Sequence, residues 1–172
     1  FLATAFLIFA LLVGSGSRHP VAMPLFAVAW CAGTILLAQF DLVFPEDPGL
    51  LRVPSLDSRL GVIGLALLPA SVIHLAMRFP VVSPRFRAPA VAGVPYVFWC
   101  FPAAIAQGNL GDALFLNLLE SVAVGTTFVA SGILIVGSLS SAHSMTPIER
   151  ARTRALVVGF GAGSISPLLQ FL

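Results

Sequence analysis

Charged side chains are scarce in this chain. Only 9% of its 172 residues are Asp, Glu, Lys or Arg, and all nine cations are Arg. Soluble domains carry roughly a quarter charged residues, so this composition cannot cover a surface that faces water. The net charge of +2 is also too small to indicate a nucleic-acid partner. The scarcity of charge therefore argues against a soluble domain and a nucleic-acid-binding protein.

Catalytic and metal-binding patterns are also missing. The two cysteines, Cys31 and Cys100, lie in apolar runs and are interpreted as buried thiols, and no Cys/His spacing fits a zinc site. The sequence has no paired carboxylates, no H-E-x-x-H and no phosphate-binding loop. Ser164 lies in a stretch that resembles the serine site of a membrane protease, but every histidine is predicted too far away to act as its base. We therefore predict no catalytic residue, no metal and no cofactor here.

Apolar residues are abundant instead. They make up 58% of the chain, with 14 Phe, and they form repeated runs long enough to cross a bilayer as helices. The pattern predicts one all-α domain over residues 1–172, a polytopic transmembrane helix bundle with six helices visible. The predicted spans are residues 1–13, 21–44, 60–79, 88–106, 113–139 and 155–172.

The two ends of the sequence indicate a piece of a longer protein. It begins at Phe1 in apolar sequence without Met and ends at Leu172 in another apolar run. We therefore expect a bundle truncated from seven or more helices. The short first run is either a truncated helix or the apolar part of a signal peptide.

Near the other end, Thr146 and Pro147 in a polar loop predict a helix start with Pro at the first position.

The arginines predict the topology. Seven of the nine lie in the first, third and fifth loops or at the helix end beside the third: Arg18, Arg78, Arg85, Arg87, Arg150, Arg152 and Arg154. Positive residues collect on the cytoplasmic side of a membrane. The odd-numbered loops are therefore predicted to be cytoplasmic, and the visible amino end is predicted to be outside.

Polar side chains in the span 113–139 form one candidate site. Asn117 and Glu120 share a helix face and are predicted to lie in the outer half of the membrane. One hypothesis is an outward-open pocket of Gln39, Asn117, Glu120 and Gln170 that holds a small extracellular or membrane-soluble ligand. The other is that these groups hydrogen-bond between helices. Glu120 is the strongest candidate, because a carboxylate in lipid needs protonation or a partner.

His74 and Arg78 form a second candidate site, near the predicted inner end of span 60–79. One interpretation is structural: His74 donates to a backbone carbonyl, and Arg78 extends to the lipid head groups. The other is a signal relay in which both side chains change partners when this helix shifts.

Two stretches resemble a known family. His74-Leu75-Ala76-Met77-Arg78-Phe79-Pro80 resembles the H-x-x-x-x-F-P helix end of bacterial seven-helix sensor regions, which are often joined to histidine kinases. Pro147-Ile148-Glu149-Arg150-Ala151-Arg152-Thr153-Arg154 resembles the E-R-x-x-x-R loop that lies two helices later in the same regions. The spacing of these elements also fits from about Leu60 to Leu172, so the resemblance covers roughly two thirds of the chain.

The resemblance implies a signal-receiving domain in the bacterial inner membrane. It implies a two-component histidine kinase whose catalytic part follows Leu172, so no catalytic residue is carried over to this stretch. Such proteins are typically dimeric, so the expected partners are the lipid bilayer and a second copy. The alternative is a transporter or channel subunit, which predicts inverted repeats and broken helices. Pro95 and Pro102, in the span 88–106, are the one hint of such a break.

Overall fold

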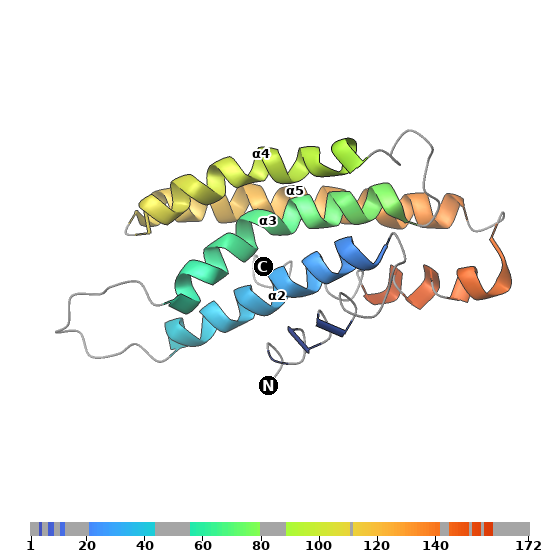
Figure 1. The fold of residues 1–172 in the computed structure, drawn as a ribbon, viewed down its shortest axis with the longest axis horizontal. Coiled ribbons are helices and arrows are strands. Elements are labelled where there is room, and N and C mark those ends of the chain that lie inside the picture. The colour runs from blue at the N-terminus through green and yellow to red at the C-terminus, as the bar shows by residue number, and fades with distance from the viewer. Residues whose placement is uncertain are drawn as a thin grey trace.

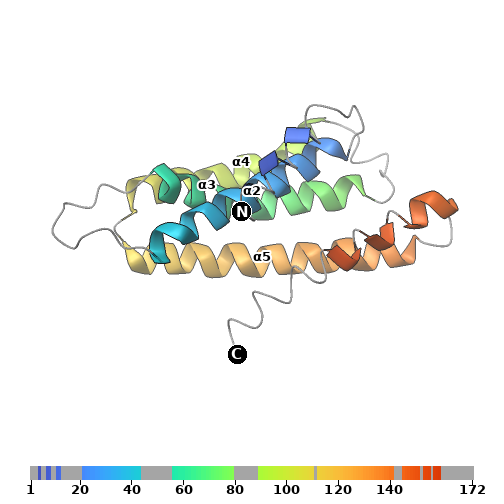
Figure 2. The ribbon, with the colours of Figure 1, turned by 90° about the horizontal axis from the view of Figure 1, so that it is seen from below.

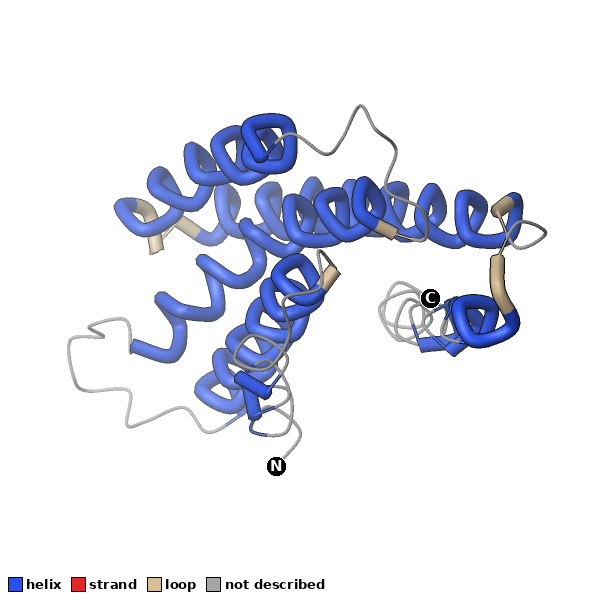
Figure 3. The backbone as a smooth tube through the Cα atoms, turned by 45° about the vertical axis from the view of Figure 1, so that its right-hand side comes forward, coloured by secondary structure: helices blue, strands red, loops and turns tan. Residues whose placement is uncertain are grey.

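The computed structural model contains four long helices. It describes residues 21–43, 56–79, 89–110, 112–141 and, with gaps at 152 and 156, 145–159, together with Thr4, Leu7, Ile8, Leu11 and Leu12. The helices are α2 (Ala22–Val43), α3 (Leu56–Arg78), α4 (Pro89–Gly108) and α5 (Ala113–Ser140). Throughout the described residues only helix and turn occur, with no strand (Figure 3). The predicted all-α class is therefore confirmed for this part of the chain.

The helix bounds follow the apolar runs closely, with one clear difference. The prediction started the third span at residue 60, but α3 begins at Leu56, inside the predicted loop. Most of the predicted spans 1–13 and 155–172 lie outside the described residues, so the number of six helices is not tested.

Among the described residues, three helices are long and apolar enough to cross a membrane: Arg59–Arg78, Val91–Gly108 and Leu114–Ser140. The apolar part of α2, Ala22–Ala38, is shorter. Large apolar side chains cover much of the outside, and Phe101 and Leu114 are 76% and 82% exposed. A soluble protein rarely exposes so much contiguous apolar surface. The fold therefore indicates a membrane protein.

Helix α3 is the centre of the bundle. It packs against α2, α4 and α5, whereas α4 and α5 barely contact each other. Figure 1 shows α3 between α2 and α4, and Figure 2 shows α5 on the far side of these three helices. Pro69 lies inside α3 and removes one intrahelical hydrogen bond, the usual cause of the bend visible in Figure 1. Any movement of one outer helix against another must therefore involve α3.

Two glycines bring α3 against α2. A Cβ atom at Gly61 would collide with the Cβ of Ala38. One at Gly64 would collide with the hydroxyl of Thr34 and lie 2.9 Å from the carbonyl oxygen of Cys31. Such close approach is how small residues stabilise helix pairs in lipid, where packing replaces the hydrophobic effect.

The core on the other side of α3 is also built from small residues. Ala66 and Ala70 of α3 face Trp99 of α4 and Leu119 and Ala123 of α5, and all five are buried. The indole of Trp99 fills the space that the alanines leave. This arrangement places a large buried ring at the junction of the three helices.

Side-chain caps begin two of the helices. Asp112 accepts a hydrogen bond from the backbone nitrogen of Phe115 at 3.1 Å and caps α5. Thr146 and Glu149 form a reciprocal capping box, since the Glu149 carboxylate accepts from the Thr146 backbone nitrogen at 2.9 Å. Pro147 is the first helical residue after it, as predicted. The helix therefore starts within the loop that the prediction extended to residue 154.

Candidate functional site

A polar pair links α3 to α4 near the carboxyl end of α3. The Nδ1 atom of His74 lies 3.1 Å from the hydroxyl oxygen of Tyr96. Their rings also meet edge to face, with centroids 5.6 Å apart and planes at 89°. Both side chains are half-buried. The predicted relay residue thus has a side-chain partner on the next helix, and not the backbone carbonyl that the structural interpretation proposed.

Arg78 lies one turn beyond His74. Its Nε atom is buried and has no hydrogen-bond partner within the described part of the chain. Both side chains line a cavity of about 550 Å³ between α2, α3 and α4. Tyr96 and Gly93 of α4 and Met23 and Phe26 of α2 line it as well. The two predicted relay residues therefore share one cavity.

The sequence reasoning missed Tyr96. It is the only tyrosine in the chain, and it occurs in an apolar span, where a hydroxyl-bearing ring needs a partner. The lone tyrosine in an apolar span could have been noticed, but the sequence does not identify its partner.

A second missed contact lies one turn before His74. The Ser71 hydroxyl donates to the Leu67 carbonyl at 2.9 Å and lies 3.7 Å from the sulfur of Cys31. Cys31 is buried, as predicted, whereas Cys100 is exposed.

The predicted pocket around Glu120 is not assembled by the described residues. Glu120 and Asn117 are exposed on the first half of α5, and neither lines the two cavities described here. No hydrogen bond joins either side chain to another described helix. The side chain of Gln39 and the whole of Gln170 lie outside the described residues.

The exposure of Glu120 has a geometric cause. Leu119, Ala123, Ala130 and Leu134 form a buried stripe along α5, and on the second half Ser131 and Ser138 are buried as well. The covered face is therefore wider on the second half of the helix than on the first. Ser131 and Ser138 share a face with Glu120 by sequence spacing, but only the serines lie where that face is covered. The Gln107 amide, at the end of α4, donates to the carbonyl of Arg59, at the amino end of α3, at 3.0 Å. Helix α5 begins shortly after Gln107, so Glu120 lies far from His74, which is near the other end of α3.

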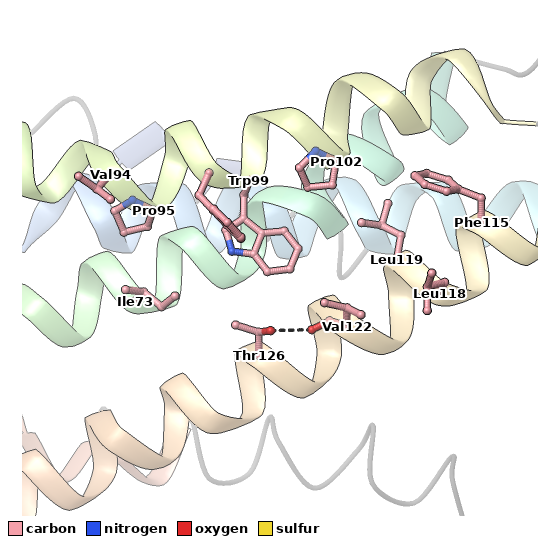
Figure 4. A pocket seen from close by; sticks show the side chains of 11 residues that line it. Ile73, Val94, Pro95, Trp99, Pro102, Phe115, Leu118, Leu119, Val122 and Thr126 are labelled. Carbon is pink, nitrogen blue, oxygen red and sulfur yellow. Dashed lines mark hydrogen bonds between the residues drawn. The ribbon is translucent and has the colours of Figure 1, made fainter.

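A groove of about 520 Å³ separates α4 from α5 (Figure 4). Its lining is apolar except for the indole nitrogen of Trp99 and the hydroxyl of Thr126, which donates to the Val122 carbonyl at 2.7 Å. Trp99 extends from α4 toward α5, and Leu118 and Val122 line the groove from α5. This mostly apolar groove is therefore a place where two helices are loosely packed.

Within the residues that the structure describes, no group of three or more His, Cys, Asp or Glu side chains is placed to hold a metal ion. Comparisons of the chain with family models, with curated proteins and with solved structures found no match. The site must therefore be interpreted from its own geometry.

Proposed function

We propose that this chain is the membrane-embedded sensing and transmitting domain of a bacterial sensor protein, most simply a two-component histidine kinase. The resemblance of the stretches around His74 and Arg150 to seven-helix sensor regions supports this function. The observation that carries the proposal is the contact between His74 and Tyr96. It joins α4 to the end of the one helix that packs against all three others.

The signal would travel as a change in helix packing. α4 and α5 are separated by an apolar groove, so their spacing can change without breaking a tightly packed surface. Both helices pack on α3, and α3 ends at Arg78. A stimulus that alters the spacing of α4 and α5 would therefore shift α3 and change the partners of His74 at its end.

In this proposal the domain is a multi-pass bundle of six or more helices in the bacterial inner membrane. The end of α3 that carries Arg78 faces the cytoplasm, as the positive-inside rule implies. A charged side chain exposed to lipid is costly, so the exposed Glu120 is expected to be covered by another helix. That helix comes from the rest of the protein or from the second copy that the resemblance implies.

The alternative, a transporter or channel subunit, predicts helices broken in matching positions. α4 runs through Pro95 and Pro102 as one continuous helix, so this helix does not support that alternative. Sequence symmetry between two halves is not visible either.

Two experiments test the proposal. The coding sequence after Leu172 should contain a further apolar helix and then a phospho-acceptor domain or another signalling output. A second complete set of membrane helices in its place would contradict the proposal.

The second experiment fills the groove in the full-length protein. Val122→Trp places a large ring between α4 and α5, whereas Val136→Trp places the same ring on exposed α5 surface outside the groove. We expect Val122→Trp to change the output, measured as autophosphorylation in membranes, and Val136→Trp to leave it unchanged. Equal outputs at equal membrane levels would refute transmission through this groove.

A further inference from the structure

The cavity at the end of α3 differs from the groove between α4 and α5 in having a charged end. Arg78, His74 and Tyr96 line one part of it, and Met23 and Phe26 line another. Among the described residues that line it there is no Asp or Glu. The cavity thus combines one permanent positive charge, two hydrogen-bonding rings and an apolar wall.

One donor of the Arg78 side chain has no partner among the described residues. The Nε atom is buried without a hydrogen bond to any of them. A buried donor of this kind is costly unless something accepts from it. The planar guanidinium fork matches the oxygens of a phosphate group. The missing acceptor is therefore most simply an anion that the described residues do not supply.

Two helix amino ends add to the same potential. α2 starts at Ala22 and α4 at Pro89, and Met23 and Gly93, in or just after their first turns, line this cavity. Free backbone N–H groups make the amino end of a helix partly positive. Neither of these helices has an acidic residue in its first turn. The field at this end of the bundle is thus uncompensated and favours an anion.

From this geometry we infer that the cavity binds the headgroup phosphate of an anionic phospholipid. Arg78 contacts the phosphate, the pair of His74 and Tyr96 closes the polar side, and an acyl chain lies along Met23 and Phe26. A free phosphate ion would satisfy Arg78 but leave the apolar wall unused. Basic cavities between membrane helices are known to hold such headgroups. The inference does not depend on the signalling function, because it concerns lipid binding alone.

The experiment uses the full-length protein in detergent, with bound lipid counted by native mass spectrometry. Phosphatidylglycerol is the anionic probe and phosphatidylcholine the zwitterionic one. The decisive variant is Gly93→Leu, since Gly93 lines the cavity and a Cβ atom there meets no atom within 4 Å. Its control is Gly125→Leu, at another open glycine, on α5 outside the cavity. We expect Gly93→Leu to weaken phosphatidylglycerol binding by roughly tenfold or more, and Gly125→Leu to leave it unchanged.

Two further measurements test whether Arg78 contributes more than a surface charge and whether the bound phosphate belongs to a lipid. Arg78→Gln should weaken phosphatidylglycerol binding more than Arg154→Gln, which removes an exposed arginine and so reports the roughly fivefold effect of one surface charge. Inorganic phosphate and glycerol phosphate, added at millimolar concentration, should not displace the lipid. Equal binding by Gly93→Leu and Gly125→Leu, or displacement by the soluble phosphates, would overturn the inference. Because Gly93→Leu keeps Arg78, it tests the cavity even where Arg78→Gln does not fold.

Discussion

The Nδ1 atom of His74 and the hydroxyl oxygen of Tyr96 lie 3.1 Å apart and join α3 to α4. Together with the Gln107 amide and the Arg59 carbonyl, 3.0 Å apart at the other end, they tie these two helices near both ends. No comparable hydrogen bond between described residues joins α4 to α5. The bundle is therefore held firmly along α3 and loosely between its outer helices.

Removing the hydroxyl of Tyr96 should weaken the link between α3 and α4 at His74 while the aromatic ring stays in place. Tyr96→Phe keeps the edge-to-face ring contact but loses the hydrogen bond, so we expect a loss of about 0.5–1.5 kcal/mol in the free energy of unfolding. A double-mutant cycle with His74→Ala, measured by denaturant titration in micelles, checks it. Additive effects in that cycle would mean that the two side chains are not coupled.

The close approach of α2 and α3 predicts opposite effects for two Gly→Ala changes. Gly64→Ala forces the new Cβ against Thr34 and the Cys31 carbonyl, so we expect a loss of about 1–3 kcal/mol from overpacking. Gly125→Ala meets no neighbour within 4 Å and should be neutral or stabilise by up to about 1 kcal/mol, because Ala is the better helix former. Thermal unfolding in detergent compares them. Similar melting temperatures for the two variants would contradict the close packing at Gly64.

Changing Glu120 to Gln distinguishes a functional from a structural role for this carboxylate. The side chain is exposed on the described bundle, and an amide of the same shape can still hydrogen-bond to the helix that is expected to cover it. We therefore expect Glu120→Gln to reach the membrane at normal levels and to unfold at nearly the parental temperature. Altered output from such a folded variant would support a ligand or contact site at Glu120. Failure to accumulate folded protein would show that the carboxylate holds the bundle together.

The capping box at Thr146 predicts a local effect. Thr146→Ala removes the hydroxyl that accepts from the Glu149 backbone nitrogen and donates to the Glu149 carboxylate. A loss of about 1 kcal/mol is typical for such a cap. Amide hydrogen exchange should accelerate in residues 147–151, whereas Ser121→Ala, which removes an exposed hydroxyl inside α5, should leave exchange there unchanged. Unchanged exchange after Thr146→Ala would show that the cap does not stabilise this helix.

The candidate site was only partly predictable from the sequence. His74 and Arg78 were identified because ionisable residues in apolar runs are rare and costly, and the two do line one cavity. The proposed grouping of Asn117 and Glu120 with Gln39 and Gln170 rested on depth alone. Depth says how far along the membrane normal a residue lies, but not which way its helix is turned. The rotation of α5 about its own axis leaves Asn117 and Glu120 on the outside of the described bundle.

The sequence by itself determined the helical class and the positions of α2, α4 and α5, with α3 correct at its carboxyl end. It does so because a backbone in lipid must satisfy its own hydrogen bonds, so long apolar runs become helices wherever they occur. Only the tertiary structure decided that α3 is central, that Tyr96 is the partner of His74, and that α4 and α5 stand apart. Those features depend on the rotation and crossing of helices, which are set by the fit of small residues such as Gly64 and Ala66 against their neighbours.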